Sequence, residues 1–171
     1  GLDIKRWSKI VWARTVTPRH AFILWVTMHD KLPVKSRLMR FTNKIDDPAC
    51  VLCNAEAEDA DHLFFQCTWA KDIWQAIQNW WPIAFDISSK EAFVRSLNKL
   101  KQPRGEKQVT YSIAAAVIYN IWRARNEKIF SNYAPSIQTY FKQIKEHTIH
   151  RLLILHSTTK KFAHSIDTLL S

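Results

Sequence analysis

IAAAVIYNIW, residues 113–122, is the longest mostly apolar run in this chain of 171 residues. It is about half as long as the roughly 20 residues that a helix needs to cross a bilayer, so we expect no membrane span. The run lies inside a helical pattern at residues 106–131 that is apolar on nearly every side. Because such a helix is stable only when neighbours cover it all round, the pattern indicates the middle of a helical bundle.

Helical patterns also flank this central segment on both sides. Apolar residues recur at spacings of three and four, and no sustained alternation with a period of two occurs. Hydrophobic residues make up 47% of the chain, and only 2 glycines and 6 prolines interrupt it. The sequence therefore predicts an all-α fold. Further helices are expected at residues 4–16, 18–30, 34–41, 69–81, 135–156 and 162–170. Another is expected to begin at a capping box formed by Ser88 and Glu91 and to end near Leu100.

All 3 cysteines of the chain fall in CVLCNAEAEDADHLFFQC, residues 50–67, together with one histidine. The spacing is Cys50-x2-Cys53-x8-His62-x4-Cys67. Zinc takes four ligands in a tetrahedron from thiolates and imidazoles, and a Cys-x2-Cys turn brings two sulfurs onto one ion. The x4 spacing is one helical turn plus a residue, which brings the second pair together. Since four protein ligands leave no open position, the window predicts one structural zinc ion in a Cys3His knuckle.

Two other interpretations of the cysteines are a disulfide with a spare thiol and three unrelated buried thiols. A disulfide with a spare thiol fits poorly, because an odd number of cysteines argues against a secreted disulfide framework. Three unrelated buried cysteines would leave their clustering to chance. The acidic run before the histidine, which includes Glu58, Asp59 and Asp61, favours the start of a helix through its dipole. We interpret it as a solvated cap rather than a carboxylate cluster for two magnesium ions.

The formal net charge is +10, and it is unevenly distributed. Residues 1–49 carry +6, residues 50–100 carry −3 and residues 101–171 carry +7. A protein this basic favours polyanions, so we expect nucleic acid as a partner, although a soluble domain with a high pI would look the same. The candidate phosphate-contacting residues are Arg19, Lys35, Arg37, Arg40, Lys44, Arg104, Lys107, Arg125 and Lys128.

Catalytic motifs are not evident. A glycine-rich phosphate loop is impossible with 2 glycines, and no carboxylate pair resembles a polymerase site. His147, His150, Arg151 and His156 gather on the last long helix, and we do not interpret them as a metal site. We therefore expect a non-catalytic module on its own, with no small-molecule substrate.

Three motifs, in order, resemble a known family. They are PRHAFILWVTMHDKLPVKSRL at residues 18–38, CVLCNAEAEDADHLFFQCTWAKDIWQAI at residues 50–77 and IWRARNEKIF at residues 121–130. Together they resemble the reverse transcriptase zinc-binding domain (zf-RVT type) of plant LINE-type non-LTR retrotransposons, over roughly residues 7–130. Its metal ligands correspond to Cys50, Cys53, His62 and Cys67.

The resemblance implies the C-terminal region of a protein that also carries endonuclease and reverse transcriptase domains. It implies binding of element RNA or target DNA during target-primed reverse transcription, with RNA preferred, and a nuclear or cytoplasmic location. Organellar targeting stays open, since the sequence can be a fragment. The alternative function is an architectural or protein-interaction module of a retrotransposon-derived protein, without a direct role at nucleic acid.

The basic stretch at residues 101–107 carries Pro103 and Gly105, and we take it as the main internal boundary. We expect a zinc-binding helical domain at residues 1–100. A C-terminal helical segment at residues 101–171 is expected to pack on it.

Overall fold

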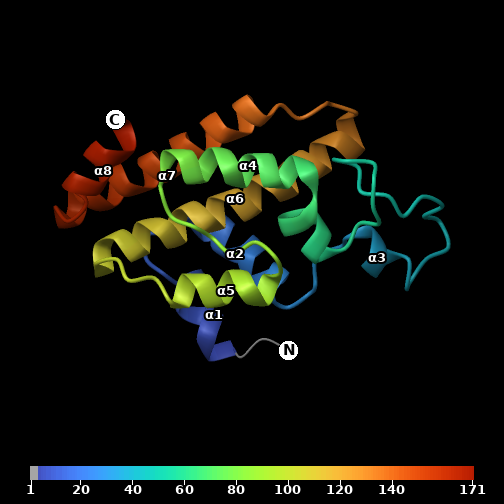
Figure 1. Cartoon of the computed structure of the whole chain (residues 1–171), viewed down its shortest axis with the longest axis horizontal. Coiled ribbons are helices and arrows are strands. Elements are labelled where there is room, and N and C mark those ends of the chain that lie inside the picture. The colour runs from blue at the N-terminus through green and yellow to red at the C-terminus, as the bar shows by residue number, and fades with distance from the viewer. Residues whose placement is uncertain (1–3) are drawn as a thin grey trace.

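Helix α6 (Arg104–Ser131) runs through the middle of the molecule, as Figure 1 shows. In this computed structural model, which describes residues 4–171, helices α1, α2, α4, α7 and α8 and the turn η1 all contact it. Every residue of α6 at positions 109–122 is buried. The all-round apolar pattern is thus satisfied by neighbours on every side, and the predicted all-α bundle with a central helix is confirmed.

The other elements share the same helical character. In the described residues, the one β-type pairing is an isolated bridge between Ala49 and Ala57. None of the described helices is both long enough and apolar enough to cross a bilayer. The remaining elements are α1 (Ile4–Val11), α2 (Pro18–Met28), α3 (Lys35–Leu38), η1 (His62–Gln66), α4 (Thr68–Trp80), α5 (Lys90–Asn98), α7 (Ile137–Thr159) and α8 (Ala163–Leu170).

Several predicted helix ends differ from the structure: α3 ends at Leu38 rather than near residue 41, and α7 ends at Thr159 rather than near residue 156. Two further differences have a visible cause. The first helix stops at Val11 rather than near residue 16, because Thr15 is buried and its hydroxyl donates to the Gln108 carbonyl at 2.5 Å. The cap of α5 is Ser89, whose Oγ accepts from the Ala92 amide, and not Ser88. Ser88 instead donates its hydroxyl to Asp86, within the turn before the helix.

The core extends across the basic stretch at residues 101–107. One cluster of buried side chains takes members from both sides of it. Indoles from both ends of α4 also reach the C-terminal segment: Trp69 donates to the Pro135 carbonyl at 2.9 Å and Trp80 to the Leu169 carbonyl at 3.0 Å. Trp81, just after α4, donates to the Thr110 hydroxyl of α6 at 3.0 Å. The tryptophan-rich helix therefore holds the C-terminal segment in place, while the division into two domains stays a prediction.

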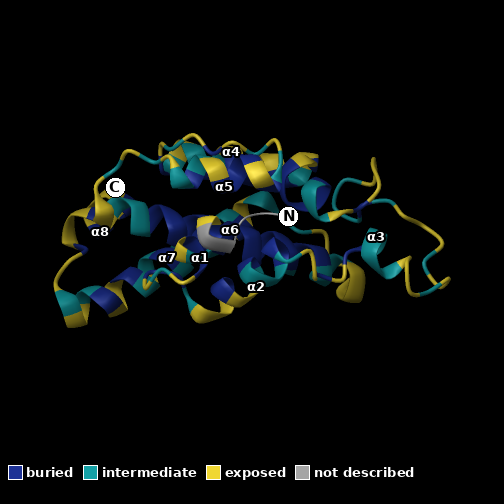
Figure 2. Ribbon diagram, turned by 90° about the horizontal axis from the view of Figure 1, so that it is seen from below, coloured by how far each residue is buried: buried dark blue, intermediate teal, exposed yellow. Residues whose placement is uncertain are grey.

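The two ends of the bundle differ. At one end, α3 and the loop that follows it extend away from the helices, and Figure 2 shows much of this loop exposed. At the other end lie the connection from α5 to α6 and the turn from α7 to α8 (Figure 1). The four predicted metal ligands belong to the first of these ends.

Candidate metal centre

The first two ligands lie on a small hairpin. The Cys50 amide donates to the Glu56 carbonyl at 2.7 Å, and the Glu58 amide donates to the Pro48 carbonyl at 2.9 Å. Between these bonds the chain reverses, with Asn54 in the left-handed region at φ 55° and its amide bonded to the Cys50 carbonyl. Asparagine tolerates this conformation better than most residues, so the turn that follows Cys53 is locally encoded.

The other two ligands lie at the two ends of a π-type turn. In η1, the Cys67 amide donates to the His62 carbonyl at 2.7 Å, a bond from residue i+5 to residue i. Five residues of an α-helix make about 1.4 turns, which would rotate the two side chains apart. The wider π turn returns residue i+5 close to residue i, so it is the physical reason that His-x4-Cys works here.

The four ligand atoms converge. The three sulfurs and the imidazole nitrogen all lie within 4.8 Å of one another. Cys50 Sγ is 3.9 Å from Cys67 Sγ, and Cys53 Sγ is 3.2 Å from His62 Nε2. With Zn–S bonds of about 2.3 Å, two sulfurs of a tetrahedral site lie roughly 3.8 Å apart. The donor set and its spacing therefore fit zinc, bound through Nε2 of the histidine.

The Cys50 thiol donates a hydrogen bond to Cys67 Sγ in this arrangement, over 3.9 Å. Their hydrogen bond is the largest cause that raises the pKa of Cys50 and lowers the pKa of Cys67. Zinc binds thiolates, so loading the site releases these protons. The ion then supplies folding free energy, because it links the hairpin to the start of α4, whose N-cap is Cys67.

Glu56 orients the histidine from the outside. Its Oε2 lies 3.4 Å from His62 Nδ1, the ring nitrogen that faces away from the sulfurs, as an ion-pair contact, and this nitrogen makes no hydrogen bond in the described chain. A carboxylate behind a metal-bound imidazole fixes its tautomer and raises its basicity. In the sequence, Glu56 is one of several acidic residues before His62 and carries no signal of this position.

Glu56→Gln is expected to weaken zinc binding about 10-fold to 100-fold, because the amide no longer holds the imidazole with a charge. A competition titration with a chromophoric chelator measures this change. Asp46→Asn, at an exposed position of the same loop, is the matched control and should leave the affinity unchanged. Equal affinities for the two variants would show that Glu56 does not support His62.

The acidic run does more than cap a helix. Asp59 Oδ1 accepts from the His62 amide at 2.7 Å, as a cap would. Asp61 Oδ1 accepts from the Lys90 amide at the start of α5, at 2.8 Å. Glu58, however, is fully buried and pairs with Arg125 of α6 through Oε1 and Nη2 at 2.7 Å. For Glu58 the predicted solvated cap is therefore wrong.

Lys35 also helps to hold the hairpin that carries the first two ligands. Its Nζ donates to the Ala49 carbonyl at 2.6 Å, and its backbone amide donates to Glu58 Oε1 at 2.9 Å. The Ser36 amide donates to the Glu58 carbonyl at 3.0 Å. These bonds attach α3 to the hairpin, so the zinc site, α3 and α6 form one connected unit.

The structure thus defines a helical protein in which three cysteines and one histidine form a largely buried candidate zinc site. Residues 3–74 of the chain match the family model described as zinc-binding in reverse transcriptase. The match contains all four ligands and covers less than half of the chain. Comparison with curated proteins and with solved structures gave no match.

Two predicted phosphate-contacting residues are engaged in the fold instead. Arg125 is buried among Glu58, the Pro33 carbonyl and the Trp122 ring, so it has no surface to offer a phosphate, and its assignment is corrected. The ammonium group of Lys35 is bonded to the zinc loop. Neither contact could be predicted from neighbouring residues, because Glu58 lies 67 positions from Arg125 and Ala49 lies 14 positions from Lys35 in sequence.

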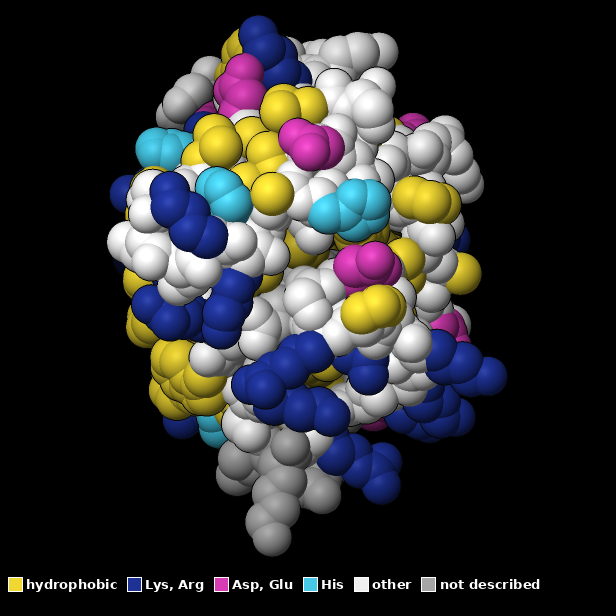
Figure 3. All heavy atoms as spheres, turned by 90° about the vertical axis from the view of Figure 1, so that its left-hand side faces the viewer, with side chains coloured by type: hydrophobic (Ala, Val, Ile, Leu, Met, Phe, Trp, Pro, Cys, Tyr) yellow, Lys and Arg dark blue, Asp and Glu magenta, His cyan; other side chains and the backbone are white. Residues whose placement is uncertain are grey.

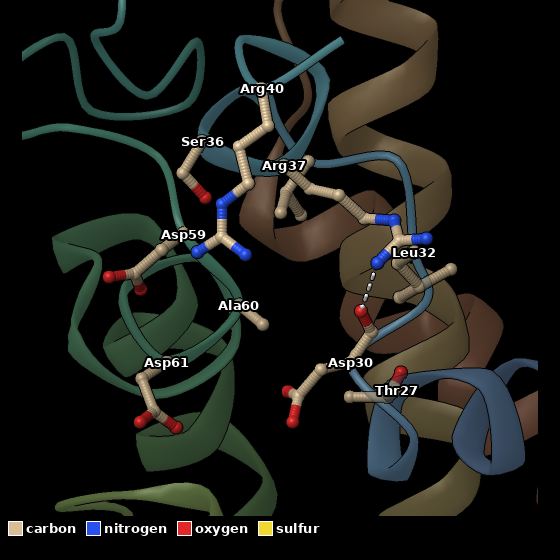
Figure 4. Close-up of a pocket in the computed structure, with 10 residues that line it drawn as sticks. Thr27, Asp30, Leu32, Ser36, Arg37, Arg40, Asp59, Ala60 and Asp61 are labelled. Carbon is tan, nitrogen blue, oxygen red and sulfur yellow. Dashed lines mark hydrogen bonds between the residues drawn. The ribbon is translucent and has the colours of Figure 1, made fainter.

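Arg37 and Arg40 border a cavity of about 210 Å3 between α3 and the start of η1. Figure 4 shows Arg37 donating to the Asp30 carbonyl, at 3.0 Å, and the Arg40 guanidinium pointing toward Asp59. Asp30, Asp59 and Asp61 line the same cavity. These carboxylates offset the arginine charges, so this surface is less favourable for a phosphate than the sequence alone indicated.

The remaining predicted contacts are spread over the molecule. Arg19 and Arg104 are exposed near the starts of α2 and α6, and Lys44 is exposed in the zinc loop. Lys107 and Lys128 are half-buried on α6. The nine candidates therefore do not form one continuous surface, and their role at nucleic acid stays a prediction.

Proposed function

We propose that this chain is a zinc-containing nucleic-acid-binding module of a LINE-type retrotransposon reverse transcriptase. It holds one structural zinc ion per chain and works in the nucleus or cytoplasm beside the endonuclease and reverse transcriptase domains. It binds RNA in preference to DNA during target-primed reverse transcription and performs no catalysis itself. The family match at residues 3–74 and the clustered zinc ligands support the reverse transcriptase context.

One observation carries the nucleic-acid part of this proposal. Exposed basic side chains gather at the end of the bundle opposite the zinc site, where Figure 3 shows Lys and Arg grouped over its lower half. Gln102 and Glu106 there line one cavity with His164 of α8, so the α5–α6 connection and α8 lie side by side. We call this surface the basic end. Its exposed members are Lys99, Lys101, Arg104, Lys160 and Lys161.

The zinc end has the opposite charge. Residues 42–61 contain one lysine and six carboxylates. Three thiolates and a neutral imidazole on a divalent ion add about one further negative charge. A polyanion is therefore repelled from the metal and attracted to the basic end, which separates the folding role of the zinc from the binding role of the helices.

Lys101→Gln with Arg104→Gln is expected to weaken binding to a single-stranded RNA and to flatten its salt dependence. Each lost phosphate contact lowers the slope of log affinity against log salt by about 0.7 for a single strand, so two contacts lower it by roughly 1.4. Fluorescence anisotropy with labelled RNA and DNA of the same sequence, across a series of salt concentrations, measures both effects.

Arg37→Gln with Arg40→Gln is the matched control, since it removes the same charge from the acid-lined cavity at the zinc end. It should change the slope less than the first pair. A larger loss for the control would move the binding surface to α3, and affinity that does not vary with salt would refute nucleic-acid binding altogether.

An architectural role is the second candidate. Leu153 and Ile154 of α7 and Leu170 of α8 are exposed and line a common shallow depression. Exposed apolar surface of this kind suits contact with another protein domain. If the wild-type chain binds a reverse transcriptase domain but no nucleic acid, this second function replaces the first.

A further inference from the structure

A second basic site lies between the start of α2 and the middle of α7. A cavity of about 460 Å3 opens there, lined by Arg19 and His20 of α2 and by His147, His150 and Arg151 of α7. Thr17, Pro18 and Ile154 complete its lining, so no carboxylate takes part. The two sides of the cavity are more than 120 positions apart in sequence, and only the packed bundle brings them together.

Several polar atoms in this cavity are not used by the fold. His20 is only 4% exposed, its ring stacks 4.5 Å from the Tyr119 ring, and no hydrogen bond of the described chain involves its side chain. His147 Nδ1 and Arg151 Nε are buried without a partner in residues 4–171. Burying donors and acceptors without partners is costly, so a ligand that satisfies them would be stabilised.

The histidines at the cavity are held neutral. Burial, together with the nearby His147, Arg19 and Arg123, lowers the pKa of His20 to about 3. Burial likewise lowers the pKa of His147, with Arg123 and Arg19 adding to the effect and Glu146 opposing it. Both imidazoles are therefore neutral at pH 7, and the charge at the cavity comes from the arginines.

The start of α2 adds backbone donors. Thr17 makes no side-chain cap bond and Pro18 occupies the first turn, so the amides of Arg19 and His20 have no partner within the helix. The 11-residue helix also directs the positive end of its dipole toward this cavity. Backbone amides at a helix start together with guanidinium groups are the arrangement that proteins use for phosphate.

We propose that this cavity, between α2 and α7, binds a phosphate group of a nucleic-acid strand. Arg19 and Arg151 supply the charge, and the imidazoles and the first-turn amides of α2 supply hydrogen bonds. The ligand is either an internal phosphodiester or a terminal phosphate monoester, which share this chemistry. The inference rests on the proposed function for the source of the phosphate, but the site itself can be tested without nucleic acid.

The first test titrates the zinc-loaded chain with inorganic phosphate at constant ionic strength. Imidazole resonances in two-dimensional NMR are the readout. Saturable shifts are expected for His20, His147 and His150, while the histidines outside the cavity serve as internal controls and should not move. These controls are His29, His62 and His156. Shifts that are absent, or equal for all histidines, overturn the site.

The second test compares variants that remove two positive charges. Arg19→Gln with Arg151→Gln should weaken oligonucleotide binding about tenfold or more, because charge-assisted bonds to phosphate are lost. Lys31→Gln with Lys71→Gln, both at exposed positions outside the cavity, is the control. Since Arg151 also donates to the Arg14 carbonyl, His150→Ala is measured as well in case the first variant does not fold. Equal weakening by the control pair overturns the site.

Oligonucleotides with a 5′-phosphate and with a 5′-hydroxyl distinguish the two sources. Tighter binding of the phosphorylated strand, lost in the cavity variant, assigns a terminal phosphate, and equal binding of both strands assigns the backbone. A wild-type chain that binds neither strand refutes the proposed function, and the inorganic phosphate titration then decides the cavity independently.

Discussion

Removing the zinc with EDTA is expected to lower the melting temperature by at least about 10 °C. Structural zinc supplies an apparent binding free energy of about 10–16 kcal/mol in small zinc domains. In a chain of this size each kcal/mol changes the melting temperature by roughly 2–4 °C. The hairpin has only one isolated β-bridge, and without the ion it keeps its bonds to α3 and α6 but loses the metal link between Cys50, Cys53 and η1. Circular dichroism on heating measures the change, and hydrogen exchange should locate it in residues 42–67.

Cys53→Ser should reproduce the effect of chelation, and EDTA should then have no further effect on this variant. Val51→Ser, between the first two ligands but not one of them, is the control and should retain about one zinc ion per chain in elemental analysis. A metal-free protein that melts at the same temperature as the loaded one would falsify the structural role of the zinc.

The central helix and the zinc ligands could be predicted because their signals are local. Residues 113–122 are apolar on all sides, which has one physical solution, a helix covered by others. Cys50 and Cys53 are separated by a turn of two residues, and His62 and Cys67 by four, so each pair is brought together by the chain near it. The π turn was not predicted, because the residue types of His62–Gln66 do not distinguish a π turn from an α-helical turn.

Whether an individual charged residue is buried or exposed could not be predicted, because this depends on partners far away in sequence. Arg123 and Arg125 are two positions apart on α6 and look alike in the sequence. Arg123 is partly exposed and pairs with Glu127 one turn away, whereas Arg125 is buried against Glu58. Similarly, Arg19 precedes the zinc window in sequence, but the bundle places it at one cavity with Arg151 of α7. A charge cluster along the chain is therefore a weak guide to a charged surface.

Arg125→Met is expected to destabilise the protein by about 3–5 kcal/mol, the cost of leaving a buried carboxylate without its partner. Glu58 is fully buried, and Arg125 contacts it through Nη2 at 2.7 Å and Nε at 3.2 Å. Arg123→Met is the matched control on the same helix. Its ion pair with Glu127 is partly exposed, so we expect a loss of about 1 kcal/mol or less. Denaturant unfolding followed by circular dichroism compares the two variants.

The double variant Glu58→Gln with Arg125→Met separates the ion pair from the packing around it. Glutamine keeps an oxygen that can accept from the Lys35 amide, as Glu58 Oε1 does, but leaves no buried charge. We therefore expect the double variant to be more stable than Arg125→Met alone. Because Glu58 also bonds to the zinc hairpin through its backbone, Arg125→Met should weaken zinc binding, and zinc loading should in turn stabilise the contact with α6. Wild-type stability and zinc affinity in Arg125→Met would show that α6 and the zinc hairpin are not coupled through this pair.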